Sequence, residues 1–270
     1  MKVTNFLEKH PVFTSTEFAT WQQQNGVTSG WTRKALLAHH CKQGHILSIR
    51  RGLYASVPLG ADPKNYSVDP YLLTAKMKED AVLAYHTALE FYAKAYSVFN
   101  HYYYQTSKIV HPTVFRGCHF VGLSFPKSLV KKNKELFGVK TEERLGLEIH
   151  VTSLERTLVD VLDRPQLGGG WEEIWRSLES VEYFDLELVI EYALLLGNAT
   201  TIAKVGYFLE QHRETLMVED KYLRRLQKFC PKQPTYLKRN KKSKLISKWN
   251  LIVPLSLVER SWEEESYKNL

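Results

Sequence analysis

Start and stop signals for short helices and a hairpin fill the first 57 residues, and their order limits the possible folds more than any other feature of the sequence. Thr14 and Glu17 have the spacing of a capping box, in which each side chain accepts a hydrogen bond from a backbone amide at the start of a helix. Ser29 can cap a further helix over residues 30–42. Two consecutive helices joined by a short turn are therefore predicted.

A basic hairpin follows these helices. Residues 46–57 are rich in β-forming side chains on both sides of Arg51 and Gly52, where glycine readily adopts the positive φ of a tight turn. A short amphipathic segment at residues 4–10 adds a helix before the two capped ones. Three helices and a basic hairpin, in this order, predict a winged helix-turn-helix domain over residues 1–58.

The rest of the chain predicts a second, larger domain. Prolines and glycines punctuate residues 59–70, which we interpret as a linker before a domain over residues 71–270. Thr152 and Glu155 have the spacing of a second capping box. Helices are expected at about 71–78, 87–95, 152–162, 171–180, 185–196, 199–214 and 219–229, and strands at 100–105, 108–111, 115–123, 146–151 and 249–253. The expected fold class is α+β, a winged helix-turn-helix followed by a mixed α/β domain with a helical C-terminal part.

The net charge of +8 is unevenly distributed along the chain. Residues 1–70 hold 8 basic and 4 acidic side chains, and residues 141–220 hold 6 basic and 17 acidic ones. Residues 221–248 hold 11 basic side chains and no acidic one. A basic surplus favours a polyanionic partner, and its division between distant segments predicts separate working surfaces.

Composition excludes several other classes of protein. A chain with 44% hydrophobic and 24% charged residues is typical of a globular protein. Cys41, Cys118 and Cys230 are too widely separated for a CxxC metal site and too few for a disulfide framework. Because neither a signal peptide nor an apolar run of about 18 residues is visible, we expect a cytoplasmic protein without a membrane partner.

The candidate DNA-binding residues lie at the start of the third helix and at the hairpin. In a helix-turn-helix motif, the N-terminal residues of the second helix contact base edges. The residues expected there are Ser29, Trp31, Thr32, Arg33 and Lys34. Arg50 and Arg51 are expected to contact phosphates or the minor groove. The alternative is an ordinary surface helix with solvated cations, with the Trp31 indole in the domain core.

The densest basic run is a possible secondary contact with nucleic acid. Its cations are Lys238, Arg239, Lys241, Lys242 and Lys244. Consecutive cations bind phosphates strongly at low salt because they release condensed counterions. A solvated loop before the last strand, or contact with an acidic partner, are the alternatives.

No catalytic pattern accompanies the histidine and acidic side chains. The ten histidines lack a ligand spacing such as HExxH, so neither a metal nor a cofactor is expected. Arg156 and Asp160 have the spacing of an ordinary helix ion pair. An enzyme hypothesis would place a divalent ion on Glu155, Asp160 and Asp163, but no nucleophile motif supports it, and we expect a protein that is not an enzyme.

Segments along nearly the whole chain resemble the AbiEi family, the antitoxins of type IV abortive-infection toxin–antitoxin systems. The N-terminal segments FTSTEF, NGV, TRKALL and GHILSIRRGLY resemble the winged-helix domain of that family. The segments HTALE from His86, VTSLERTLVD from Val151 and WNLIV from Trp249 resemble landmarks of its antitoxin domain. The LERTLVD stretch is the most specific part of the resemblance.

The resemblance implies two roles. The N-terminal domain would bind inverted repeats of double-stranded DNA in the promoter of its own operon and repress it. The C-terminal domain would neutralise a cognate toxin with a nucleotidyltransferase fold, with or without a stable complex. The alternative function is a plain winged-helix transcriptional regulator in which the region after residue 70 senses a ligand or mediates dimerisation.

Overall fold

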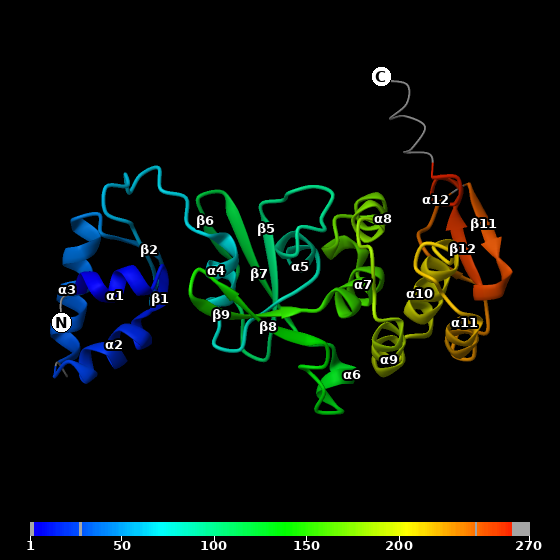
Figure 1. Ribbon diagram of the computed structural model, residues 1–270, viewed down its shortest axis with the longest axis horizontal. Coiled ribbons are helices and arrows are strands. Elements are labelled where there is room, and N and C mark those ends of the chain that lie inside the picture. Colours follow the sequence, from blue (N-terminus) through cyan, green and yellow to red (C-terminus); the bar gives the residue numbers. More distant parts are fainter. Residues whose placement is uncertain (1–2, 27–28, 241, 261–270) are drawn as a thin grey trace, which may run out of the picture. The chain divides into compact units, whose positions relative to one another are not determined.

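The computed structural model describes residues 3–26, 29–240 and 242–260 (Figure 1). The chain divides into two compact units, each built from more than one segment. The first unit comprises Met1–Leu83, Asn100–Leu123 and Thr141–His150, and the second comprises Ala84–Phe99, Ser124–Lys140 and Val151–Leu270. Helices alternate with strands that form several sheets, so the fold is mixed α/β.

Three helices and a small antiparallel sheet form the N-terminal part of the first unit. The helices are α1 (Val3–Lys9), α2 (Ser15–Gln24) and α3 (Gly30–Lys42), and the strands β1 (Val12–Thr14), β2 (Ile46–Arg50) and β3 (Leu53–Ser56) pair in the order β1-β3-β2. The predicted capping box is confirmed, because Thr14 Oγ1 accepts from the Glu17 amide at 3.2 Å and Glu17 Oε2 accepts from the Thr14 amide at 2.7 Å. The predicted cap of α3 by Ser29 is confirmed as well.

An aromatic cluster holds these elements together. Phe6, Phe13 and Phe18 come from α1, β1 and α2, and their ring centroids lie 5.1 to 5.9 Å apart. Leu37 of α3 and Ile46 of β2 are buried in the same cluster. Because α3 is fixed through the middle of the helix, its first turn is left at the surface of this part of the chain.

A six-stranded sheet follows α4 (Pro70–Ala75). Its strands are β4 (Val82–Leu83), β5 (His101–Thr106), β6 (Thr113–Phe115), β7 (Cys118–Ser124), β8 (Val139–Arg144) and β9 (Leu147–Thr152), in the order β6-β7-β5-β4-β9-β8. The strand predicted at 108–111 is wrong, since these residues form a loop, and the strand predicted at 115–123 is divided by a turn at Arg116 and Gly117. Strand β8 was not predicted, because its charged sequence VKTEER is typical of a loop.

Helix α7 (Leu154–Asp163) is the centre of the second unit, and all its residues from Glu155 to Leu162 are buried. It packs against four helices, α5 (His86–Phe91), α8 (Trp171–Glu179), α9 (Leu186–Leu196) and α10 (Ala199–Gln211). Two more, α6 (Lys127–Val130) and α11 (Asp220–Gln227), contact α9.

The second predicted capping box is wrong by one position. Ser153, not Thr152, occupies the N-cap of α7, and its hydroxyl accepts from the Arg156 amide. Thr152 is the last residue of β9, so its backbone still belongs to the sheet, and its hydroxyl lies 2.8 Å from the hydroxyl of Thr157.

A three-stranded sheet closes the second unit (Figure 1). Strand β12 (Leu251–Pro254) lies between β10 (Thr235–Tyr236), which is parallel to it, and β11 (Ser243–Ile246), which is antiparallel. The predicted strand at 249–253 begins later, because Ser247–Trp249 form a turn of 3₁₀ helix. A short helix α12 (Leu255–Val258) follows β12.

The boundaries of the two units differ from the predicted domains 1–58, 59–70 and 71–270. The first unit joins the N-terminal helices to the six-stranded sheet, and it includes an ion pair between Glu17 and Lys76 and a hydrogen bond from Arg50 to the Met77 carbonyl. As domains of separate function, the predicted ranges stay a prediction. In the described part of the chain, no helix is both long enough and apolar enough to span a bilayer.

Candidate nucleic-acid interface

The first turn of α3 brings together five predicted DNA-binding residues. Ser29 is exposed, and its hydroxyl accepts from the Thr32 amide at 3.3 Å, which fixes the start of the helix. Thr32 and Lys34 are exposed and Arg33 is half-buried. Trp31 has an exposed fraction of 81%, so the alternative that places its indole in the domain core is wrong.

The two predicted arginines of the hairpin between β2 and β3 differ in exposure. Gly52 has φ +80°, as a tight turn requires, and its carbonyl accepts from the Ser15 amide at 2.8 Å. Arg51 lies exposed in this turn. Arg50 is half-buried and donates to the Met77 carbonyl, so its guanidinium is already engaged within the first unit. The exposed cation of the hairpin is therefore Arg51.

The secondary basic residues border the C-terminal sheet. Lys238 and Arg239 follow β10, Lys242 precedes β11 and Lys244 lies within β11; all four are exposed. Lys241 lies outside the described residues. The described residues of the basic run therefore lie partly in strand β11 and partly in the segments next to β10 and β11. It belongs to the second unit, whereas α3 and the hairpin belong to the first.

The acidic residues of the enzyme hypothesis have structural partners. Asp160 is buried, its Oδ1 accepts from the Tyr192 hydroxyl at 2.6 Å, and its Oδ2 lies 3.4 Å from Arg156 Nε. Burial raises the pKa of the Asp160 carboxyl, and the Arg156 charge and the Tyr192 hydrogen bond oppose that rise.

Each of the other two carboxylates of that hypothesis accepts hydrogen bonds through one of its oxygens. Glu155 Oε1 accepts from the Asp185 amide, and Asp163 Oδ1 accepts from the Asn198 amide group and the Thr201 hydroxyl. Within the described ranges, no three histidine, cysteine, aspartate or glutamate side chains are placed to hold a metal ion.

His86 lies buried between two carboxylates in the second unit. Its Nδ1 is 3.0 Å from Glu90 Oε1 and its Nε2 is 3.0 Å from Glu173 Oε1. The backbone amides of Phe99 and Ser97 donate to the same two carboxylates. These contacts tie α5 and α8 to the segment that leads into β5, so this part of the HTALE segment serves the fold.

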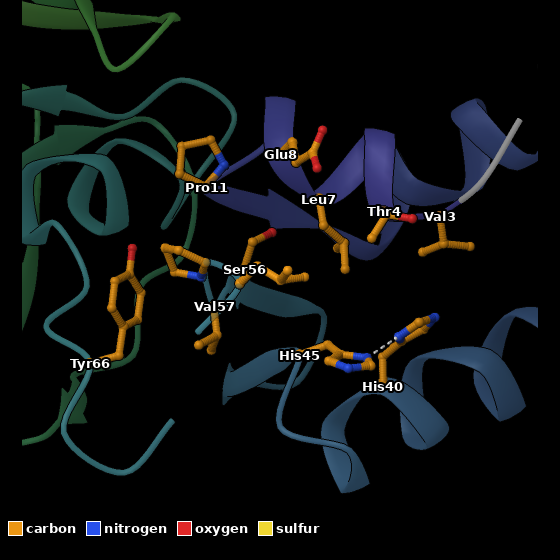
Figure 2. Close-up of a pocket in the computed structure, with 12 residues that line it drawn as sticks. Val3, Thr4, Leu7, Glu8, Pro11, His40, His45, Ser56, Val57 and Tyr66 are labelled. Atoms are coloured by element: carbon orange, nitrogen blue, oxygen red, sulfur yellow. Dashed lines mark hydrogen bonds between the residues drawn. The ribbon is translucent and has the colours of Figure 1, made fainter. Parts of the chain in front are cut away.

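A cavity of about 750 Å³ lies beside α1 in the first unit (Figure 2). Its apolar lining includes Val3, Leu7, Pro11 and Val57, and its polar lining includes Glu8, His40 and His45. The two histidines are joined through their Nδ1 atoms at 3.1 Å. Burial lowers the pKa of His40, and the neighbouring His45 and His39 lower it further. Sequence reasoning missed this cavity because its walls come from four separate segments.

Comparisons with known proteins bear on the fold of the chain and not on its function. No family model and no curated protein matches the sequence. Among solved structures, the chain is similar to the crystal structure of the RV2827C protein from Mycobacterium tuberculosis, with a TM-score of 0.62 and 16% sequence identity over 96% of this chain and 93% of that one. The similarity therefore extends over nearly the whole of both chains.

Proposed function

We propose that this protein is a DNA-binding autorepressor and the antitoxin of a type IV toxin–antitoxin pair. The observation that carries the DNA-binding part is the exposed first turn of α3. Trp31, Thr32 and Lys34 are exposed there, while Leu37 of the same helix is buried in the aromatic cluster. With the basic hairpin, the three helices are interpreted as a winged helix-turn-helix over residues 1–58.

In this proposal, α3 lies in the major groove of the promoter. The residues of its first turn contact base edges, namely Ser29, Trp31, Thr32, Arg33 and Lys34. Arg51 reaches a phosphate or the minor groove from the hairpin. Arg50 has a different role, since its bond to the Met77 carbonyl holds the hairpin to the rest of the first unit.

The test of DNA binding is a gel shift with the promoter of the protein's own operon at about 0.15 M salt, which is near physiological ionic strength. Lys34→Ala is expected to weaken specific binding by about 1–3 kcal/mol if the ammonium reads a base. Lys42→Ala is the matched control, because Lys42 is exposed in the last turn of the same helix. Equal affinity for the promoter and for random duplex would refute the proposal.

The antitoxin part of the proposal draws its support from the resemblance to the AbiEi family. The LERTLVD segment, its most specific part, forms the first seven residues of α7, which is buried at the centre of the second unit. The segment therefore supports a shared fold of this unit, and the toxin-facing residues belong to surfaces around it. Co-expression of the full-length protein with the neighbouring toxin gene is expected to restore growth, and continued growth arrest would refute this part.

A ligand-responsive transcriptional regulator is the second candidate function, and the cavity beside α1 favours it. This cavity is lined by residues between Val3 and Tyr66, so the ligand site would lie in the first unit and not after residue 70, where the sequence placed it. Its volume falls within the range of small-molecule sites, and its walls are largely apolar with a few polar groups, as such sites require. This candidate predicts a ligand-dependent gel shift that is lost when Leu7→Trp fills the cavity, and it predicts no rescue from the toxin.

A further inference from the structure

The outer face of the C-terminal sheet carries a row of apolar side chains. In the strand register, Tyr236 of β10 and Leu245 of β11 both pair with Ile252 of the central strand β12. Residues paired in this way project from the same face of a sheet. The exposed fractions are 50% for Tyr236 and 47% for Leu245, so the two edges of the row are open to solvent.

The opposite face of this sheet is covered by α10. Leu251 and Val253, which alternate with Ile252, are fully buried. Trp249 is buried against Gly206 of α10, and its indole Nε1 donates to Glu210 Oε2 at 2.6 Å. The sheet is therefore fixed through one face, and the row on its other face contributes little to that packing.

Unpaired cations lie close in the chain to the exposed row. Residues 221–258 contain 11 basic side chains and no acidic one. Some of these cations are paired with distant carboxylates, as Arg225 is with Glu187 and Lys248 with Glu210. Lys238, Arg239, Lys242 and Lys244 form no ion pair within the described residues. Lys238 and Arg239 follow β10, and Lys242 directly precedes β11. Lys244 lies within β11 and pairs with Val253, so it projects from the face opposite to Leu245.

We propose that this face binds single-stranded RNA. An exposed tyrosine on a sheet offers a flat surface on which an unpaired base stacks, and flanking lysines and arginines neutralise the phosphates. The row spans two strand spacings, or about 10 Å, which suits a short single-stranded segment. Cellular single strands are chiefly RNA, which makes RNA rather than DNA the occupant.

The same surface is less well suited to duplex DNA or to an acidic protein. A duplex presents sugar and phosphate outwards and keeps its bases paired, so it would leave the apolar row uncovered. An acidic protein surface would satisfy the cations without requiring the tyrosine ring. The dependence of binding on the Tyr236 ring and on strandedness therefore distinguishes the three occupants.

The test measures the fluorescence anisotropy of a labelled RNA that has no secondary structure. Its length is about 12 nucleotides, which is within the usual site size of proteins that bind single strands. The full-length protein is expected to bind this RNA more tightly than duplex DNA of the same sequence. Tyr236→Ala is expected to raise Kd about tenfold, whereas Tyr236→Phe, which keeps the ring, is expected to bind like the parent protein. Tyr183→Ala is the matched control, because Tyr183 is 70% exposed on another part of the second unit.

The cations are tested by the salt dependence of the same Kd. Replacing Lys238 and Arg239 together by alanine is expected to lower the slope of log Kd against log salt by about 1.4, at the value per phosphate of single strands. Lys221→Ala is the control, since Lys221 is paired with Glu219 at 2.7 Å. Lys34→Ala is expected to weaken promoter binding and to leave RNA binding unchanged, which separates this site from α3.

Three results would overturn the binding of a single strand at this face. They are a Kd for RNA that Tyr236→Ala leaves unchanged, displacement of the RNA by polyglutamate at matched charge, and duplex DNA that binds as tightly as the RNA and loses affinity in Tyr236→Ala. Tighter binding of single-stranded DNA than of RNA would overturn the assignment to RNA. Far-ultraviolet circular dichroism of each variant checks that Tyr236→Ala leaves the sheet folded, and Tyr236→Phe covers the case in which it does not.

Discussion

Arg156 is the largest charged side chain in the interior of the second unit, and its partners are mostly backbone atoms. Its Nη1 donates to the carbonyls of Glu135 and Phe137 at 2.7 and 2.6 Å, and its Nε lies 3.4 Å from Asp160. The i, i+4 spacing predicted this ion pair as an ordinary helix pair. Its burial could not be predicted, because the loop that supplies the carbonyls lies about twenty residues away in the sequence.

Replacing Arg156 tests how much this interior network contributes to stability. Arg156→Leu is expected to lower the free energy of unfolding by about 3–5 kcal/mol, because it leaves the Asp160 carboxylate and two carbonyls buried without their partner. Urea unfolding followed by circular dichroism measures the change. Arg213→Ala is the control, since Arg213 and Asp220 form an exposed pair that contributes less than about 1 kcal/mol. Equal losses in the two variants would contradict the assignment.

The lowered pKa of Glu173 makes the stability of the protein depend on pH. Burial raises the pKa of its carboxyl, but hydrogen bonds from Ser97, His86 and Ser177 outweigh burial and hold the pKa below its ordinary value of 4.5. A carboxyl with a lowered pKa in the folded state stabilises the protein above its unfolded pKa, and this contribution is lost as the pH falls through the folded value. Glu173→Gln is therefore expected to destabilise the protein at pH 7 and progressively less below about pH 4.5. If Glu173→Gln lowers the free energy of unfolding equally at pH 7 and pH 3, the prediction is wrong.

At the level of elements, the sequence predicted best where the signal is local. The caps at Thr14 and Ser29 and the turn at Gly52 each depend on residues within four positions, and the structure has all three. The strands β8 and β11 each pair with the next strand along the chain, and they were missed because their own polar and charged side chains are typical of loops. The candidate site followed the same rule, since the first turn of α3 was predicted and the engagement of Arg50 by Met77 was not.

The close contact between Gly206 of α10 and Trp249, just before strand β12, predicts the effect of a larger side chain on stability. A Cβ atom on Gly206 would lie 2.1 to 2.6 Å from the ring of Trp249, so Gly206→Ala must displace a buried indole that is hydrogen-bonded to Glu210. Alanine favours a helix over glycine by about 1 kcal/mol, but overpacking of this kind costs about 1–3 kcal/mol, so a net loss of stability is expected. Thermal unfolding followed by tryptophan fluorescence measures it.

Gly30→Ala is the control for this variant, because its Cβ would meet only the end of the flexible Arg33 side chain at 3.4 Å. This substitution is expected to leave stability unchanged or slightly raised. A stabilised Gly206→Ala protein would show that the indole can move away at little cost, and the sheet would then be less firmly fixed to α10 than the geometry indicates.

For the molecule as a whole, the segment predicted as a linker is tied to the first unit. Arg116 donates to the carbonyls of Tyr66 and Pro63. Asp69 caps α4 and forms an ion pair with Arg144 at 2.7 Å. A chain cut after residue 70 would lose these contacts as well as the bond from Arg50 to Met77. The two proposed roles are therefore better separated by point substitutions in the full chain than by expressing its halves.

The last prediction concerns this separation of roles. Because Lys34 is exposed on α3, which belongs to the first unit, Lys34→Ala in the full chain is expected to abolish repression of a promoter fusion while rescue from the toxin persists. Arg156→Leu is expected to do the reverse at a temperature where the second unit is partly unfolded, provided that the first unit still binds the promoter.

A fragment of residues 71–270 is expected to rescue less well than the Lys34→Ala protein, because the fragment lacks Asp69 and the partners of Lys76 and Met77. Growth assays and promoter-fusion activity measured in the same strains decide between these outcomes, and simultaneous loss of both activities in Lys34→Ala would show that the two roles share one surface.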